Sequence, residues 1–110
     1  MKRTYEVIVK VNDDVKLLPV HAYSVVHAGF IITYSMSYER ILSITEVSAH
    51  RYHVLKMAAA IANADTWLDC EEECVELCRL AGMLTEWREA DGDTFEFVLN
   101  EAAKKLCVKI

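Results

Sequence analysis

The chain opens with a regular alternation of apolar and polar side chains. Every second residue from Tyr5 to Val11 is apolar, and two of the three residues between them are charged. A period of two places the apolar side chains on one face of a β-strand. The turn-forming run Asn-Asp-Asp at 12–14 follows directly. The pattern therefore predicts a strand over about 5–11 that ends in a turn.

A second strand-like region follows this turn. Residues 20–34 are rich in Val, Ile, Tyr and Phe, which favour strands, and Gly29 interrupts the run. We expect two strands, at about 22–27 and 30–35, joined by a turn or continuous through a bulge at the glycine. The wider uncharged stretch 17–38 contains too many polar groups for a membrane-spanning helix. The pattern therefore predicts buried strands and no membrane span.

The spacing of apolar residues then changes to that of a helix. Ser43 and Glu46 stand at the spacing of a capping box, which marks the start of a helix. Apolar positions after this box recur on one helical face until about Asn63. The sequence therefore predicts a first helix that begins at Ser43 and ends near Asn63.

A second helix is predicted from a box formed by Thr66 and Asp69, and it would run to about Leu84. Three glutamates at 71–73 suit the positive end of its dipole. Its apolar positions fall on one stripe at helical spacing. The residues of this stripe are Cys70, Cys74, Leu77, Ala81 and Leu84.

The region after the second helix is predicted to form a β-hairpin. The run Ala-Asp-Gly at 90–92 fits a three-residue loop with glycine in the left-handed position. This register would pair Trp87 with Phe95 and Thr85 with Phe97 on one face.

The end of the chain alternates again, from Leu106 to Ile110, and this predicts a closing strand. A short C-terminal helix capped by Asn100 is the competing interpretation. Strands, two helices and strands in this order favour the α+β class. We therefore expect an antiparallel sheet, made of the N-terminal strands and the C-terminal hairpin or meander, packed against two central helices. A chain of 110 residues corresponds to a single domain, 1–110.

Composition narrows the class of protein. The hydrophobic share of 54% excludes a disordered chain. The charged residues near Met1 do not fit a signal peptide, so we expect a cytoplasmic protein with its four cysteines reduced.

Three of the cysteines, Cys70, Cys74 and Cys78, are spaced by four residues. One straight helix spreads these sulfurs over two turns, which is too far to close a tetrahedral metal site. We therefore expect buried, reduced thiols that pack as small apolar groups and bind no metal. A half-site completed by Cys107 or a histidine, and a redox role, remain the alternatives.

No catalytic motif stands out. His50 and His53 lie three residues apart without a third ligand, and His21 and His27 lie in an apolar region. The chain has no glycine-rich phosphate loop and no nucleophile elbow. We expect no catalytic residue and no cofactor. The alternative is a small enzyme or ligand-binding domain with a pocket lined by tyrosine and histidine.

Charge is distributed unevenly within the net value of −5. Residues 65–101 contain twelve Asp or Glu residues but only two arginines, whereas residues 1–64 contain seven Lys or Arg residues and five acids. Glu72 and Glu76 lie one helical turn apart, and Glu86 would oppose Glu96 in the predicted hairpin. Each arrangement places two negative charges close together, which costs some stability. A solvated surface explains many acids, but retained repulsion favours a docking surface. We assign to it Glu72, Glu76, Glu86, Glu89, Asp91, Asp93 and Glu96.

The acidic block argues against direct binding of nucleic acid, which favours a basic patch. The sequence instead predicts a non-catalytic protein–protein interaction protein that docks on the basic surface of a partner protein. In composition it is similar to small acidic inhibitors, some of them from phages, that occupy basic sites by imitating nucleic-acid charge. A homodimer is compatible with the same sequence.

Overall fold

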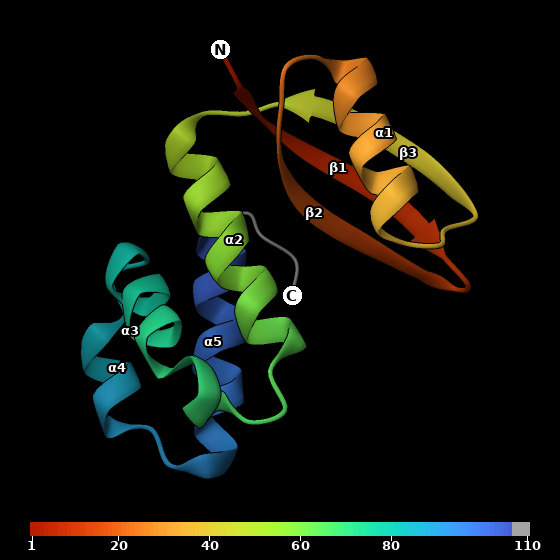
Figure 1. Cartoon of the computed structure of the whole chain (residues 1–110). Coiled ribbons are helices and arrows are strands. Elements are labelled where there is room, and N and C mark those ends of the chain that lie inside the picture. Colours follow the sequence, from red (N-terminus) through yellow and green to blue (C-terminus); the bar gives the residue numbers. More distant parts are fainter. Residues whose placement is uncertain (107–110) are drawn as a thin grey trace. The chain divides into compact units, whose positions relative to one another are not determined.

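The computed structural model describes residues 1–106. Contacts divide the chain into two compact units, residues 1–56 and 57–110, which are described separately (Figure 1). We call them the sheet unit and the helical unit. The division falls within helix α2 (Ala49–Asn63). The single domain expected from the length of the chain stays a prediction.

The sheet unit contains three antiparallel strands in the order β2-β1-β3. They are β1 (Arg3–Val11), β2 (Asp14–Ala22) and β3 (Arg40–Glu46). Val11 pairs with Asp14, and a two-residue turn with Asn12 at φ 55° joins the first two strands. The strand and the turn predicted at the start of the chain are therefore confirmed.

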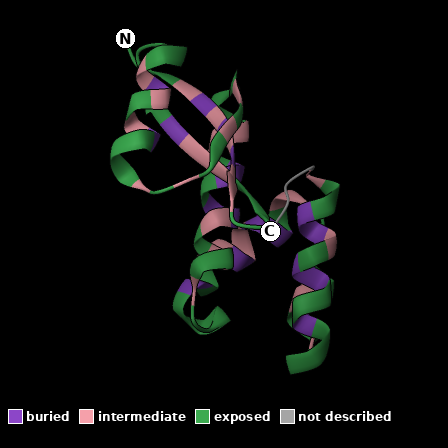
Figure 2. Cartoon of the chain, turned by 90° about the vertical axis from the view of Figure 1, so that its right-hand side faces the viewer, coloured by how far each residue is buried: buried purple, intermediate pink, exposed green. Residues whose placement is uncertain are grey.

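Helix α1 (Val25–Ser35) packs against all three strands and connects β2 to β3. The alternating face of β1 meets this helix, so the period of two in the sequence does mark the core side of the sheet. Figure 2 shows buried positions recurring along the strands and helices. The core cluster of this unit comprises Tyr5, Val7, Val9, Val20, Ala22, Ala28 and Ile32.

The two strands predicted at 22–27 and 30–35 were wrong, because 25–35 forms α1. Ser24 caps this helix: its Oγ accepts a hydrogen bond from the backbone N–H of His27 at 3.1 Å. The His27 Nδ1 in turn accepts one from the backbone N–H of Tyr23 at 2.9 Å. This reciprocal arrangement and packing against the sheet outweigh the strand preference of the Val- and Ile-rich sequence.

The helix start predicted at Ser43 was also wrong, because Ser43 and Glu46 belong to β3. Helix α2 begins at Ala49. The Oγ of Ser48 accepts the backbone N–H of Arg51 at 3.1 Å, so Ser48 satisfies a donor of the first helical turn. The predicted end near Asn63 is confirmed.

The helical unit continues with a 3-10 turn and three helices. They are η1 (Trp67–Cys70), α3 (Glu71–Leu80), α4 (Leu84–Glu89) and α5 (Gly92–Lys105). Helices α3, α4 and α5 contact one another, and η1 contacts α3. The buried residues on these elements are Cys70, Cys74, Leu77, Cys78, Phe95, Val98, Leu99, Ala102 and Ala103.

The predicted C-terminal hairpin was wrong. Asp91, which we placed in its loop, is the N-cap of α5, and its Oδ1 accepts the backbone N–H of Thr94 at 3.2 Å. The sheet therefore consists of β1–β3 without a C-terminal contribution among residues 1–106, and within the sheet unit α1 packs against it. The α+β class itself is confirmed. Leu106 lies in a turn, and the rest of the predicted closing strand lies outside the described residues.

The second predicted helix ends earlier than expected, at Leu80. Gly82 has a φ of 74°, and the N–H of Met83 donates to the carbonyl of Cys78 at 2.7 Å. This is a Schellman ending, which needs a residue in the left-handed region. None of the helices within residues 1–106 combines the length and the apolar character needed to cross a membrane.

Candidate functional site

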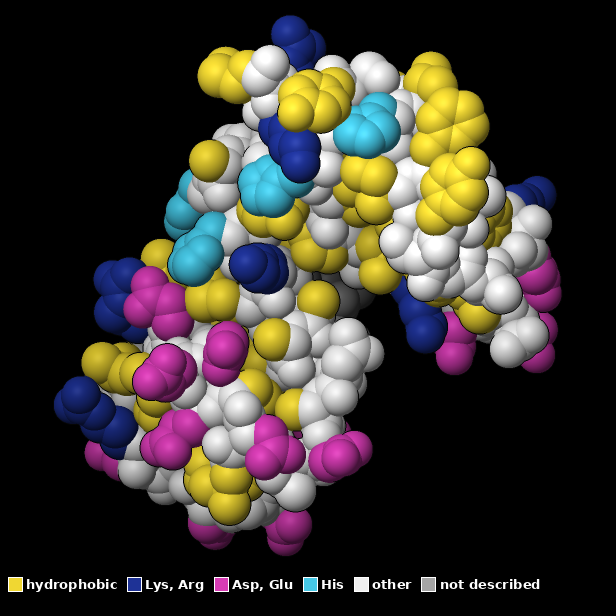
Figure 3. All heavy atoms as spheres, in the orientation of Figure 1, with side chains coloured by type: hydrophobic (Ala, Val, Ile, Leu, Met, Phe, Trp, Pro, Cys, Tyr) yellow, Lys and Arg dark blue, Asp and Glu magenta, His cyan; other side chains and the backbone are white. Residues whose placement is uncertain are grey.

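The seven acidic residues predicted as a docking surface all lie in the helical unit. Glu72 and Glu76 are on α3, Glu86 and Glu89 are on α4, and the other three are at the start of α5 or on its first turns. Six of the seven are exposed, and Glu76 is half-buried. Figure 3 shows acidic side chains spread over the visible face of these helices, with hydrophobic side chains between them.

Two of these acids form hydrogen bonds within their own segments of the chain. The Glu76 carboxylate accepts a hydrogen bond from Arg79 Nε at 2.9 Å within α3. The hydrogen bonds from Thr94 lower the pKa of the Asp91 carboxyl, which caps α5. The repulsion expected between Glu86 and Glu96 across a hairpin does not apply, because these residues lie on helices α4 and α5. Two of the seven predicted docking residues, Glu76 and Asp91, therefore also have roles within the fold.

Three aromatic side chains meet beside the acids. Trp67, Trp87 and Phe95 come from η1, α4 and α5. Their ring centroids lie 5.7 Å apart for the two tryptophans, 4.7 Å for Trp67 and Phe95, and 4.6 Å for Trp87 and Phe95. The Trp87–Phe95 contact was predicted across a hairpin, but two helices form it. We call these three residues the aromatic cluster.

A groove of about 690 Å³ opens beside the aromatic cluster. The chain from the end of α2 to η1 forms one side, and the first half of α5 forms the other. Asp65 and Glu96 are its acidic lining residues, and none of the Lys, Arg and His residues within 1–106 lines it. The described residues that line it are Ile61, Ala62, Ala64, Asp65, Thr66, Trp67, Leu68, Gly92, Phe95, Glu96, Leu99 and Asn100. We call it the acidic groove.

A smaller cavity of about 220 Å³ lies next to the acidic groove and shares Trp67, Gly92 and Phe95 with it. Glu71 and Asp91 line this cavity together with Arg88. The aromatic cluster therefore stands between two hollows, and carboxylates border both.

The sequence did not single out the acidic groove. A local signal existed, because Trp67 and Leu68 follow directly after the polar residues Asp65 and Thr66 and stay 39% and 63% exposed. The opposite wall lies about thirty residues further along the chain. Only the packing of α5 shows that the two segments face one hollow.

The three described cysteines are buried, as predicted. Cys70, Cys74 and Cys78 are buried and form no disulfide with one another, and the Sγ atoms of Cys70 and Cys74 lie 3.7 Å apart. Burial and the neighbouring Cys70 raise the pKa of the Cys74 thiol to about 12. Burial also raises the pKa of Cys78. These thiols pack as apolar groups, whereas their reduced and metal-free state stays a prediction, and Cys107 lies outside the described residues.

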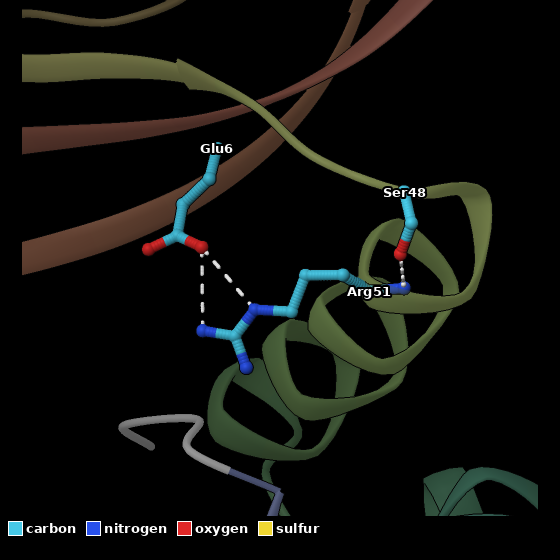
Figure 4. A network of polar contacts seen from close by, with 3 residues as sticks. All are labelled: Glu6, Ser48 and Arg51. Carbon is cyan, nitrogen blue, oxygen red and sulfur yellow. Dashed lines mark hydrogen bonds and ion pairs between the residues drawn. The ribbon is translucent and has the colours of Figure 1, made fainter.

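The histidines and tyrosines do not line either of these hollows. In the sheet unit, His21 lies against Tyr52 with ring centroids 4.0 Å apart, and burial raises the pKa of the Tyr52 hydroxyl. Beside them, Arg51 Nε and Nη2 each donate to a Glu6 carboxylate oxygen at 3.3 Å (Figure 4). These contacts attach the start of α2 to the sheet. A pocket lined by tyrosine and histidine stays a prediction.

No family model matches the chain, and searches among curated proteins and solved structures found no match either. The protein can therefore be described only by its structural class, an α+β protein. The protein has a small sheet unit and a helical unit, and the helical unit exposes carboxylates around an aromatic-lined groove.

Proposed function

We propose that the protein is a non-catalytic interaction protein whose helical unit docks on a basic surface of a partner protein. The observation that carries this proposal is the exposure of carboxylates on α3, α4 and α5. Within residues 65–101 the only cationic side chains are Arg79 and Arg88 against twelve acids, and Lys104 and Lys105 follow at the end of α5. Several like charges on adjacent helices produce a negative field, which attracts a basic surface before contact is made.

The chemistry of the partner follows from the sign of this field. Basic protein surfaces of this kind commonly bind nucleic-acid phosphates. A helical surface rich in carboxylates presents the same sign of charge and competes for the same site. The partner that fits best is therefore a nucleic-acid-binding protein, with its basic surface blocked by this chain.

The test compares two baits that carry the same change of charge. Glu72→Lys combined with Glu89→Lys changes two exposed acids of the helical unit, and Asp13→Lys combined with Asp14→Lys changes two exposed acids of the sheet unit. Glu76 is left unchanged because it bonds with Arg79. Each bait is used to capture proteins from lysate of the source cells, and a double-stranded DNA oligonucleotide is added as a competitor.

We expect the wild type and the Asp13/Asp14 variant to capture the same basic protein, which DNA displaces. The Glu72/Glu89 variant should bind it at least about tenfold more weakly, because steering by charge changes association rates by that order. Equal capture by all three baits, or capture that DNA does not displace, would contradict the proposal.

A further inference from the structure

We infer that the acidic groove is the anchoring site of this interaction. It takes one bulky apolar side chain from a partner segment in which Lys or Arg residues flank that side chain. This inference rests on the proposed function, and it names the place and the chemistry of the contact.

The floor of the groove is apolar and incompletely covered. Ile61, Phe95 and Leu99 line it, and Trp67 and Leu68 remain 39% and 63% exposed beside them. Large apolar side chains grouped around one hollow mark binding surfaces more often than single exposed ones do. A volume of about 690 Å³ lies within the range of ligand pockets, which is roughly 300–1,000 Å³. Bulky apolar anchors that fill such hollows supply much of the binding energy of interfaces.

The rim of the groove selects the charge of the occupant. Asp65 and Glu96 line the groove itself. Glu71 and Asp91 line the adjoining cavity, where they outnumber the one cationic lining residue, Arg88. An acidic segment would meet like charges here, whereas a basic segment could place ammonium or guanidinium groups against the carboxylates. Trp67, which is 39% exposed, offers a further contact for a cation.

The walls of the groove are held in place before any partner arrives. Trp67 packs against both Trp87 and Phe95 in the aromatic cluster. Phe95 is buried, and α5 is capped by Asp91 one turn before it. A site whose side chains are already ordered loses less conformational entropy on binding than a mobile one.

Gly92 provides a way to block the groove. It lines both hollows, its φ is not in the left-handed region, and no atom lies within 4 Å of a Cβ placed on it. Gly92→Leu therefore adds a side chain at the junction of the two hollows without a backbone clash, and leucine is a better helix former than glycine. Trp67→Ala is the second variant, because it removes the wall instead of filling the space.

The probes are three synthetic peptides of equal length. The first peptide carries Leu at helical spacing (i, i+3, i+4, i+7) and Lys at positions between the leucines. The second peptide has Gln in place of each Leu, and the third has Glu in place of each Lys. The chain contains two tryptophans, both in the aromatic cluster, so its intrinsic fluorescence reports on the groove. Phe97→Ala is the control variant, because Phe97 is 62% exposed on α5 and does not line the groove.

We expect the Lys/Leu peptide to bind saturably and to shift the tryptophan emission to the blue. The Lys/Gln peptide should bind at least about tenfold more weakly, since one apolar anchor is worth about 1.5–3 kcal/mol. The Glu/Leu peptide should not bind. Gly92→Leu should reduce affinity for the Lys/Leu peptide to that of the Lys/Gln peptide, and Phe97→Ala should leave it unchanged.

Equal binding of the Lys/Leu and Glu/Leu peptides would overturn the inference about charge. Wild-type affinity in both Gly92→Leu and Trp67→Ala would overturn the inference about place. The proposed function fails separately, because it predicts an effect of the Glu72/Glu89 reversal, and neither of these residues lines the groove. If the Glu72/Glu89 reversal abolished binding of the Lys/Leu peptide while Gly92→Leu and Trp67→Ala had no effect, the proposed function would stand. The inference that the acidic groove is the anchoring site would then be wrong.

Discussion

The two units of the chain use charged residues in different ways. In the sheet unit, the ion pairs among described residues join separate segments: Arg3 with Glu46 at 3.6 Å, Lys10 with Glu39 at 3.8 Å, and Arg51 with Glu6 at 3.3 Å. These residues come from neighbouring strands, from the entrance to β3 and from α2. Charge in the sheet unit therefore links elements of the fold.

In the helical unit, the ion pairs among described residues are local. Arg79 pairs with Glu76 and Lys104 pairs with Glu101, each three residues apart on one helix. Exposed local pairs of this kind contribute little stability. Most acids of this unit do not connect its helices, and its stability must come from the buried apolar stripe. Among the described residues, charge in the helical unit therefore does not link elements of the fold as it does in the sheet unit.

The largest expected effect tests the source of stability in the helical unit. Leu77 is fully buried on α3, so Leu77→Ala should lower the free energy of unfolding by about 2–5 kcal/mol. Phe97→Ala, at a 62% exposed position, should change it by no more than about 0.5 kcal/mol. Urea denaturation followed by circular dichroism measures both. Similar losses in the two variants would show that the stripe is not the core of this unit.

The next effect concerns the buried thiols. Cys74 is fully buried beside Cys70, and Cys74→Ser should cost about 1–3 kcal/mol because it buries a hydroxyl in an apolar stripe. Thermal unfolding at neutral pH gives the comparison with the wild type. An unchanged melting temperature would mean that this hydroxyl finds a partner.

The same thiol gives stability a dependence on pH. Its pKa rises from the ordinary 9.0 to about 12 on folding, so the folded protein disfavours the thiolate. Stability should be unaffected below pH 9 and should fall as the pH rises towards 12, because only the unfolded chain loses this proton there. Denaturation curves of wild type and Cys74→Ala over this range isolate the contribution. Parallel curves would contradict it.

A matched pair of charge removals tests the comparison between the units directly. Glu6 and Arg51 are only 16% and 25% exposed at their side chains, so Glu6→Gln should cost about 1–2 kcal/mol. Glu72→Gln, on the exposed side of α3, should change stability by less than about 0.5 kcal/mol. If Glu72→Gln cost as much as Glu6→Gln, the acids of the helical unit would be structural as well.

Two glycines of the helical unit give the smallest effect. Gly82 adopts a φ of 74° after α3, so Gly82→Ala should cost about 1 kcal/mol. Gly92 begins α5 with open space around it, and Gly92→Ala should be neutral or stabilising by up to about 1 kcal/mol. The hairpin interpretation required the opposite, with Gly92 as the sensitive position. Melting temperatures of the two variants decide between them.

Local patterns predicted the parts of the fold that depend on local physics. The alternation from Tyr5 to Val11 marked a strand, and the spacing of Cys74 and Leu77 marked the buried side of α3. Ala81 and Leu84, which the same stripe included, are only half-buried and lie beyond the end of this helix. These patterns succeed because the same periodicity governs both the sequence and the burial of side chains.

The failures have specific physical causes. Residues 25–35 have the composition of a strand, but capping by Ser24 and packing on the sheet make them helical. The spacing of Ser43 and Glu46 imitates a capping box, although both lie on a strand. Gly82 was a helix-ending signal that the sequence offered and that we did not use.

One part of the candidate site could be predicted from the sequence, and another part could not. Composition alone pointed to the acids of 65–101, and most of them are exposed, which both a docking surface and a solvated surface require. The acidic groove could not be predicted, because its two walls, at 61–68 and 92–100, meet only through the packing of the helices. Periodicity does not specify which helix faces lie beside one another.

The most direct test of the account is the salt dependence of binding to the Lys/Leu peptide. Fluorescence titrations over about 50–500 mM salt cover the range in which exposed charges become screened. The wild type and the Asp13/Asp14 reversal should bind tightly at low salt and progressively more weakly as salt rises. The Glu72/Glu89 reversal should bind more weakly at low salt and depend less on salt. An affinity that is indifferent both to salt and to the Glu72/Glu89 reversal would show that the acids of the helical unit form only a solvated surface.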